Sequence, residues 1–432
     1  MEPTVAFYTL GCKLNFAETS AMARSFEAAG YRRVDWEEKA SVYVINTCTV
    51  TDNADKRVRS LVRGVLRRHP EAYIVAAGCY AQVNPEEIQR SGGVDLVVGA
   101  SDKFRITDYL TSLEKEKRAR ILCSDLTAET DYHGAYSLSE RTRAFLKIQD
   151  GCDYRCSYCT IPLARGRSRS EPLESVLRHA EKIVASGIRE IVLTGVNTGD
   201  WGRTAGRGQT FFDVVRSMDR VEGLDRVRIS SIEPNLITDE ILEYIARSDK
   251  FVPHFHIPLQ SGCDPVLKDM RRRYLTPLYR HRIEKIRELM PDACIGADVI
   301  VGFPTETDEY FQQTYDFIDS LDISYLHVFT YSERENTPAA AMGVSVPADV
   351  RAKRSKVLHL LGGKKRAAFY RRHLGQTRPV LFESEEKDGF MFGFTDNYIK
   401  VKHPWDERLV NAIRPVRLER EDPDGTVFCS LP

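Results

Sequence analysis

Three cysteines lie close together in the segment GCDYRCSYC, where Cys152, Cys156 and Cys159 have the spacing C-x3-C-x2-C. The run before them, 144–149, alternates like a strand, and residues 162–170 have the composition of a loop. The three thiols therefore lie on one short loop after a strand. Thiolates select zinc or iron–sulfur clusters. On a four-iron cluster, three ligands leave one iron open to a substrate. The alternative is a zinc half-site completed by a distant ligand.

Three more cysteines follow predicted strands in the first third of the chain. Cys12, Cys48 and Cys79 come just after the runs 4–9, 41–46 and 73–77. The carboxyl ends of parallel strands share one edge of a sheet, where ligands collect, so we expect these thiols to lie together. They predict a second three-cysteine cluster, again with an open iron. The alternative is three unrelated buried cysteines, since free cysteine is often a core residue.

The hydrophobic pattern indicates an α/β protein. Strands are predicted at 4–9, 41–46, 73–77 and 94–98, with helices at 16–29, 54–69 and 85–90 between them. This alternation predicts an open parallel sheet with helices on its faces. After a polar linker at 125–139, six further strands alternate with helices such as 173–185; they are predicted at 144–149, 189–194, 226–231, 254–258, 295–301 and 324–330.

The last quarter of the chain changes character. Residues 351–378 carry ten Lys or Arg and no acid, within a helix predicted at 348–373, and residues 56–69 carry six and no acid. We favour phosphate-facing surfaces over ordinary solvated helix faces. From 376 onward, short strands separated by turn residues predict a five-stranded barrel. Its aromatic and basic residues suit nucleic-acid contact, although alternate aromatics are as often core; they are Phe390, Phe392, Phe394, Tyr398, Lys400, Lys402 and Trp405.

The composition limits how the chain can bind nucleic acid, where it is expected to act and what its cysteines do. Lys plus Arg and Asp plus Glu are both 62, so nucleic-acid binding must come from local patches. No apolar run approaches a membrane span, and the first residues lack the features of a secretory signal, so we expect a cytoplasmic enzyme without membrane contact. Ten cysteines then indicate reduced thiols and metal rather than disulfides. Four of them match no ligand pattern and are interpreted as structural thiols: Cys123, Cys263, Cys294 and Cys429.

The loop of Cys152, Cys156 and Cys159, with Tyr158 before the last cysteine, resembles the signature of radical S-adenosylmethionine (SAM) enzymes. With three cysteines ahead of it, the whole chain resembles the methylthiotransferases of that superfamily. The resemblance implies two [4Fe-4S] clusters and SAM. It implies that one SAM gives a methyl to sulfur held at the second cluster, and that another yields the 5′-deoxyadenosyl radical. Family members replace a C–H bond by C–SCH3.

The resemblance also implies three domains. These are an N-terminal methylthiotransferase domain with an auxiliary cluster at 1–124, a radical SAM core with an open (β/α)6 barrel at 138–370, and a small all-β TRAM domain at 371–432. Active sites of such barrels lie at the carboxyl ends of the strands.

The residues that contact SAM are also implied by the resemblance. Val301 and Gly302 are expected on the adenine, and Ser230, Ser231 and Glu233 near the ribose and methionine. The complete expected set is Tyr158, Thr194, Gly195, Val196, Asn197, Ser231, Glu233, Gln260, Ser261, Val301 and Gly302. Two positions depart from the family pattern. Thr305 replaces a common glycine and resists positive φ, whereas Asn336 tolerates it.

The segment LGCKLN, 10–15, resembles the branch that acts on tRNA carrying N6-threonylcarbamoyladenosine immediately 3′ of the anticodon. Lys13 is expected either to meet the threonyl carboxylate or to serve the cluster loop. An electron donor such as flavodoxin or ferredoxin is implied. The alternatives are isopentenyladenosine in tRNA, an aspartate of a ribosomal protein, or an RNA-binding iron–sulfur protein without turnover.

Overall fold

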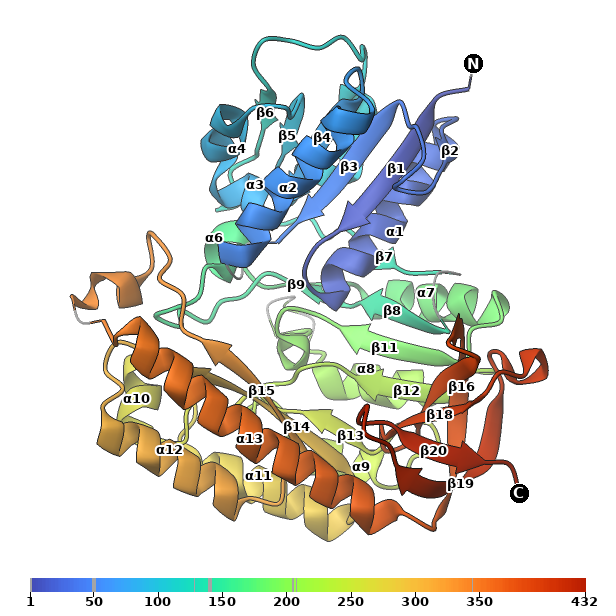
Figure 1. The fold of residues 1–432 in the computed structure, drawn as a ribbon, viewed down its shortest axis with the longest axis vertical. Coiled ribbons are helices and arrows are strands. Elements are labelled where there is room, and N and C mark those ends of the chain that lie inside the picture. Colours follow the sequence, from blue (N-terminus) through green and yellow to red (C-terminus); the bar gives the residue numbers. More distant parts are fainter. Residues whose placement is uncertain are drawn as a thin grey trace.

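The computed structural model describes residues 2–48, 52–127, 129–138, 142–203, 206, 208–343 and 345–432. An N-terminal α/β part, coloured blue, sits above an open central barrel, and a small red C-terminal barrel lies beside the lower end of the central strands (Figure 1). Among the described residues, no helix is long and apolar enough to cross a membrane.

The N-terminal part is one six-stranded parallel sheet in the order β2-β1-β3-β4-β5-β6. Helix α1 covers one face through Met22 and Phe26, and α2 covers the other through Val58 and Val62. Because both faces are covered, the central strands are apolar throughout. The strands are β1 (Thr4–Thr9), β2 (Arg32–Arg33), β3 (Val42–Thr47), β4 (Tyr73–Gly78), β5 (Leu96–Val98) and β6 (Arg120–Leu122).

The predicted strands and helices of this part are confirmed, and the structure adds the two short edge strands β2 and β6. The helices are α1 (Lys13–Ala28), α2 (Asp52–Arg68), α3 (Cys79–Val83), α4 (Pro85–Ser91), η1 (Asp102–Arg105) and α5 (Ile106–Tyr109). The predicted linker at 125–139 is not free: its strand β7 (Ala135–Tyr136) pairs antiparallel with β8 (Arg143–Lys147), and His133 stacks on Phe104. Ala128 and Ser139 of this segment lie outside the described residues.

All six central strands are confirmed as a parallel set that forms an open barrel. Strands β8, β11 and β12 pair side by side, as do β13, β14 and β15, and single parallel bridges such as Ser231 to His256 join the two groups. These strands are β8, β11 (Glu190–Thr194), β12 (Arg226–Ile229), β13 (His254–His256), β14 (Cys294–Val301) and β15 (Tyr325–Thr330). A two-stranded piece of β9 (Gln149–Asp150) and β10 (Arg169–Ser170) flanks the cysteine loop.

The interior of the central barrel is polar. On each strand one set of alternate residues packs under the outer helices, as Leu146 and Leu193 do. The other set faces inward and includes Arg143, Arg228 and His256, which line a cavity. A parallel strand buried on both faces is usually apolar throughout, so inward charges mark a site rather than a core.

Helices cover the outside of the barrel. The longest, α13, packs against β14 and β15 and leads into the C-terminal barrel. Because α13 ends at His373, the predicted domain boundary at 370 falls inside this helix. The helices are α6 (Ile161–Arg165), α7 (Leu173–Ala185), η2 (Thr198–Asp200), α8 (Phe211–Met218), α9 (Asp239–Ile245), α10 (Asp264–Asp269), α11 (Thr276–Leu289), α12 (Asp308–Ser320), η3 (Pro338–Met342) and α13 (Ala348–His373).

The predicted C-terminal barrel is confirmed as five closed strands in the order β16-β17-β18-β20-β19. Phe382 and Met391 fill its core, while Phe390, Phe392 and Phe394 alternate on the other face of β17 and are only partly buried. Its elements are β16 (Thr377–Lys387), β17 (Phe390–Thr395), β18 (Lys400–Pro404), η4 (Glu407–Leu409), β19 (Ile413–Glu421) and β20 (Val427–Ser430).

Candidate active site

The three N-terminal cysteines meet at one edge of the six-stranded sheet. Cys12 caps α1, Cys48 follows β3 and Cys79 begins α3, and all three line one cavity of about 1610 Å³. Gly11, between β1 and Cys12, has φ of +96°, and a side chain there would come within 2.7 Å of the Cys48 sulfur. Only glycine allows this approach, so the backbone is built to bring the first two cysteines together.

Two side chains fasten the loops that carry these cysteines. The Asn15 amide donates to the carbonyls of Leu10 (2.6 Å) and Thr47 (3.1 Å), which precede the first two cysteine positions. The Thr47 hydroxyl donates to the carbonyl of Ala77 and accepts from the N–H of Ala81, on either side of Cys79. The three strand ends are thus linked by hydrogen bonds before any metal is bound.

The other three cysteines lie on the loop between β9 and α6. The N–H of Cys159 donates to the carbonyl of Cys156 (3.1 Å), which folds the loop back on itself. Arg272 donates to the Cys156 sulfur and to the Tyr158 hydroxyl, both at 3.3 Å, and pairs with Glu233. Cationic N–H donors to cysteine sulfur are a recognised means of tuning iron–sulfur clusters.

The two cysteine sets border neighbouring cavities. Cys159 lines a second cavity of about 760 Å³, together with Tyr158 and Gln260. Ile161 and Phe329 line both cavities, so the two spaces adjoin. This arrangement lets a group held near one cysteine set meet a group held near the other.

A buried ionic cluster positions the two sets relative to each other. Arg165, at the end of the helix after Cys159, donates to Asn15 Oδ1 (2.8 Å), to both oxygens of Glu18 (2.8 and 2.9 Å) and to Asp150. Lys103 and Lys147 complete the environment of Glu18, whose side chain has no exposed surface. The cluster joins α1 of the N-terminal part to the cysteine loop of the barrel.

Burial raises the pKa of one thiol of the N-terminal set and of all three thiols of the cysteine loop. The pKa of Cys152 and of Cys159 is raised to about 12, and those of Cys156 and Cys79 are raised as well. These thiols are therefore protonated until a cation replaces the proton. Three soft sulfur donors per site fit an iron–sulfur cluster with one open iron.

Several of the predicted SAM contacts border the cavities. Thr194, Gly195, Val196 and Ser231 line the first cavity, while Tyr158 and Gln260 line the second. Asn197 is buried, and neither polar atom of its amide has a hydrogen-bond partner among the described residues. A buried amide without partners is costly, so this position suits a polar ligand.

Three other residues that were predicted to contact SAM line neither cavity: Ser261, Val301 and Glu233. Ser261 shares a hydrogen bond with Thr314 of α12 and lines neither cavity. Val301 packs in the core beneath the outer helices, whereas its neighbour Ile300 lines the second cavity. The carboxylate of Glu233 is taken up by Arg272.

The backbone conformation differs at Gly302, Thr305 and Asn336. Gly302 has φ of +77°, and a Cβ there would lie 2.4 Å from Arg351, so the turn after β14 requires glycine. Asn336 has φ of +64°, as its tolerance of the left-handed region allows. Thr305 is not among the residues with positive φ, so that turn uses ordinary backbone.

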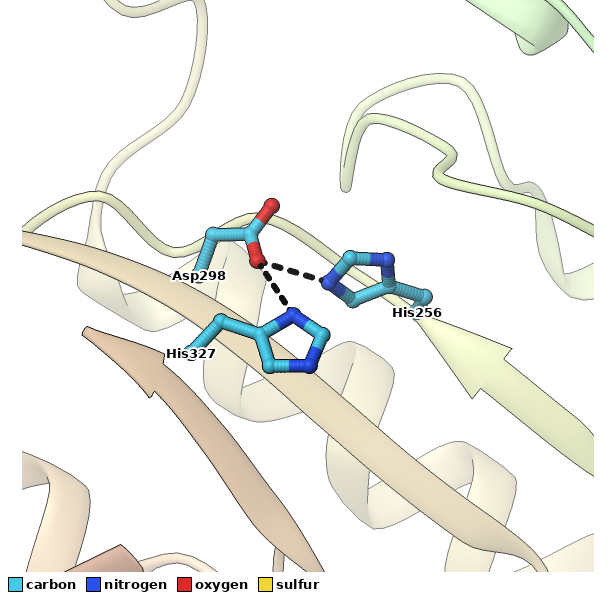
Figure 2. A group of neighbouring side chains, drawn as sticks. All are labelled: His256, Asp298 and His327. Atoms are coloured by element: carbon cyan, nitrogen blue, oxygen red, sulfur yellow. Dashed lines mark hydrogen bonds and ion pairs between the residues drawn. The ribbon is translucent and has the colours of Figure 1, made fainter. Parts of the chain in front are cut away.

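A polar trio inside the barrel was missed from the sequence. His256, Asp298 and His327 come from adjacent strands, and both rings point at Oδ1 of Asp298, at 2.8 and 3.2 Å (Figure 2). Burial alone would raise the pKa of Asp298, but these hydrogen bonds outweigh it and hold the pKa far below its ordinary value. Charged and polar residues at alternate positions of predicted buried strands were the available signal.

Basic residues gather where the N-terminal part and the C-terminal barrel meet the first cavity. Its lining includes Lys13, Arg57, Arg143, Arg228 and Arg366. Burial, and then the charges of Arg228 and Arg143, lower the pKa of Lys13 to about 8. On α13, by contrast, Arg354 and Arg372 pair with acids of the barrel, so only part of its charge is free for a ligand.

Comparison with known proteins decides the family. Residues 4–99 match the family described as "Uncharacterized protein family UPF0004" and residues 146–318 match the Radical SAM superfamily. The chain is 42% identical to the threonylcarbamoyladenosine tRNA methylthiotransferase MtaB of Bacillus subtilis, over 96% of this chain and 93% of that protein. The chain belongs to the radical SAM methylthiotransferase family. This methylthiotransferase is also 29% identical to the tRNA-2-methylthio-N(6)-dimethylallyladenosine synthase of Aquifex aeolicus, over 96% of both chains.

A solved structure is similar in fold. The methyltransferase TsrM of Kitasatospora setae, a radical SAM enzyme, aligns with a TM-score of 0.56 at 15% identity, over 78% of this chain and 77% of its own. Membership of the family makes the protein a radical SAM enzyme that uses SAM and iron–sulfur chemistry. The predictions of the family, the fold class and the enzyme class are thereby confirmed.

Proposed function

We propose that this methylthiotransferase acts on tRNA and replaces the C2–H of N6-threonylcarbamoyladenosine, next to the anticodon, by C2–SCH3. The observation that carries the proposal is the placement of two cysteine sets at adjoining cavities: Cys12, Cys48 and Cys79 line the first, and Cys159 of the loop set lines the second. The printed activity of the Bacillus subtilis relative supplies the substrate, and its identity exceeds that of the dimethylallyladenosine synthase.

Two [4Fe-4S] clusters are part of the proposal. Cys152, Cys156 and Cys159 would hold one, and the second would be held by Cys12, Cys48 and Cys79. When bound, the clusters and SAM supply the radical, the methyl group and the sulfur. The protein then has to hold the adenine between the two sites, keep water out and hold SAM at the loop cluster.

The chain's own residues can perform these tasks. Asn197 presents an unpartnered amide that suits the polar end of SAM, and Tyr158 and Gln260 border the space beside Cys159. Arg272 donates hydrogen bonds to the Tyr158 hydroxyl and to the Cys156 sulfur, and so fixes their relative positions. The hydrogen bonds from Asn15 and Arg165 keep the N-terminal cysteines in place relative to that loop.

The tRNA is proposed to lie across α13 and the C-terminal barrel. Unstacked bases of an RNA loop can stack on aromatic side chains and meet phosphate-binding cations. Phe390 and Phe392 are partly buried on β17, and Lys400 lies over the Phe392 ring at 4.9 Å. Lys402 lies over Phe390 at 5.3 Å but is paired with Asp422 and Asp424, so Lys400 is the better phosphate ligand of the two. We also propose that the domains span residues 1–124, 138–370 and 371–432. The proposed electron donor is a flavodoxin or ferredoxin. The proposed location is the cytoplasm, where tRNA is modified.

The test is mass spectrometry of tRNA nucleosides from cells that lack the protein and from the same cells supplied with it. The account predicts that 2-methylthio-N6-threonylcarbamoyladenosine disappears in its absence and returns with it. Loss of the 2-methylthio derivative of isopentenyladenosine instead would reject the proposed substrate.

A further inference from the structure

We propose that Arg228, assisted by Arg143 and Lys13, forms an anion subsite that binds the carboxylate of the threonyl group. The inference rests on the proposed function and deepens it. All three residues line the first cavity, which also holds the N-terminal cysteines. They come from β12, β8 and the start of α1, so the subsite joins the barrel to the N-terminal part.

Arg228 is the strongest part of the argument. Its side chain is only 3% exposed, and its Nε and Nη1 atoms have no hydrogen-bond partner among the described residues. Glu190 forms a buried ion pair with Arg228 at 3.7 Å from Nε, a distance too long for a hydrogen bond, so the N–H groups stay unpaired. A buried guanidinium with unpaired N–H groups is costly, so this position calls for an acceptor that arrives with a ligand.

Arg143 supplies a second donor of the same kind. Its Nη1 is buried without a partner among the described residues, although Nη2 pairs with Glu383. The guanidinium lies over the ring of Phe394 at 4.5 Å, and Arg228 lies over Tyr398 at 4.1 Å. These two rings stack on each other at 4.6 Å. Stacking fixes the guanidinium planes and leaves their edges for a carboxylate, which arginine binds in a bidentate manner.

Lys13 and His254 complete the surroundings of the two arginines. Lys13 has no ion pair or hydrogen bond within the described part of the chain, and it is half-buried at the same cavity. Burial, and then the charges of Arg228 and Lys13, hold the pKa of His254 well below its ordinary value, so this ring is neutral. Its Nδ1 is buried without a partner as well.

The position of the subsite favours the substrate over SAM. Arg143 is the first residue of β8, four residues before its end, or roughly 13 Å at the rise of a strand. Arg228 is level with Phe145, two residues closer to the carboxyl ends. The subsite therefore extends along the barrel interior next to Phe394 and Tyr398 of the C-terminal barrel, whereas the cysteine loop follows the carboxyl ends of the strands. The threonylcarbamoyl arm is flexible and hangs from N6, so C2 of the base can face the cysteines while the carboxylate reaches Arg228.

The test measures the methylthiolation of two anticodon stem-loops by the reconstituted enzyme. One carries N6-threonylcarbamoyladenosine and the other its threonyl carboxamide, which has the same size without the charge. For the wild type we expect a preference for the carboxylate of about tenfold or more in kcat/KM, the value of a hydrogen bond to a charged group. In Arg228→Met the ratio should fall to about one, with turnover of the carboxamide retained.

Arg226→Met is the matched control. Arg226 lies two residues away on the same face of β12, but it donates to the carbonyls of Phe394 and Pro379. This variant should keep the wild-type ratio. Should Arg228→Met fail to fold, the comparison of the two stem-loops with the wild type still decides.

Three results would overturn the inference. Equal methylthiolation of both stem-loops by the wild type would reject the subsite and leave the proposed function intact. A raised KM for SAM in 5′-deoxyadenosine formation by Arg228→Met, with an unchanged stem-loop ratio, would assign the carboxylate to SAM. Methylthiolation of neither stem-loop, with SAM cleavage intact, would reject the proposed function and the subsite with it.

Discussion

Arg165 shows how single residues tie the two halves of this site together. It follows Cys159 closely in sequence, yet its hydrogen bonds reach Asn15 and Glu18 on the first helix. Asn15 in turn holds the backbone before Cys12 and Cys48. One buried guanidinium therefore links the two cysteine sets directly, beside the pair of Lys147 with Glu18.

Replacing this guanidinium should cost stability. Arg165→Met leaves Glu18 and Asp150 with fewer counter-charges in a buried place, so we expect the free energy of unfolding to fall by about 3 kcal/mol. Chemical denaturation followed by circular dichroism measures it. Arg216→Met, which removes an exposed pair with Asp213, is the control and should change the value by less than about 0.5 kcal/mol. Equal effects of the two substitutions would contradict the role of Arg165.

Glu18 gives a pH-dependent prediction. Burial alone would raise its pKa, but the charges of Arg165, Lys103 and Lys147 outweigh burial and hold the pKa well below 4.5. A depressed carboxyl pKa stabilises the fold above the unfolded pKa, and this contribution is lost as the pH falls through the folded pKa. The stability gap between wild type and Glu18→Gln should therefore be full at pH 7 and shrink below about pH 4.5. A gap that stays constant with pH would count against this assignment.

At the scale of elements, the strands and helices were predictable because their hydrophobic patterns are strong. The core strands β3 and β4 are fully buried, and all six barrel strands appeared where expected. The short strands β2, β6 and β7 were missed because two or three residues carry no periodicity. The ion cluster of Glu18 was also missed, since its partner Arg165 is 147 residues away and no local pattern links them.

Some site residues could be predicted from local sequence patterns, whereas others depend on how the strands are arranged in the fold. That Cys12, Cys48 and Cys79 lie at one cavity could be predicted, because cysteines placed just after strands are a local signal. Val301 was expected on the adenine, but the strand alternation turns it under the helices and presents Ile300 instead. Charged residues such as Arg228 could not be recognised as site residues from the sequence, because only the arrangement of the strands in the barrel shows that they face inward.

The helix α13 carries the prediction about tRNA binding. Lys365 donates to the carbonyl of Asp319, near the end of α12, and to the carbonyl of Leu321, so it stabilises the fold and is a poor probe of RNA contact. Lys364 and Arg366 are exposed, and Arg366 also lines the first cavity. Reversing both charges should weaken tRNA binding and reduce the slope of log Kd against log salt by about one per lost phosphate contact.

Fluorescence anisotropy at several salt concentrations gives this slope. Lys353→Glu is the control on the same helix, because Lys353 pairs with Asp349 and lies away from the cavity lining. Iron content should be unchanged in every variant. An unaltered slope in the Lys364 and Arg366 variant would remove α13 from the RNA surface.

At the scale of the whole molecule, all three parts of the chain contribute to one cavity. The N-terminal sheet supplies three cysteines, the open barrel supplies the charged inner face, and the C-terminal barrel adds Phe394 and Tyr398 to the lining. The interfaces between the parts are therefore functional surfaces as well as structural ones.

Iron content tests the cofactors. Two three-cysteine sites predict about eight irons per chain after anaerobic reconstitution. Replacing Cys152, Cys156 and Cys159 together by alanine should leave roughly half of the iron. Zinc in place of iron, without the visible absorption of an iron–sulfur cluster, would reject the assignment of both sites.

The most direct test of the central claim uses the reconstituted protein, SAM, a reductant and three anticodon stem-loops, bearing threonylcarbamoyladenosine, isopentenyladenosine or unmodified adenosine. Mass spectrometry of the nucleosides and detection of 5′-deoxyadenosine report the outcome. The account predicts methylthiolation of the threonylcarbamoyl form above the others. It also predicts that replacing Cys12, Cys48 and Cys79 abolishes the methylthio product while some SAM cleavage persists. Preferred methylthiolation of the isopentenyl form, or product formation by that triple variant, would contradict the account.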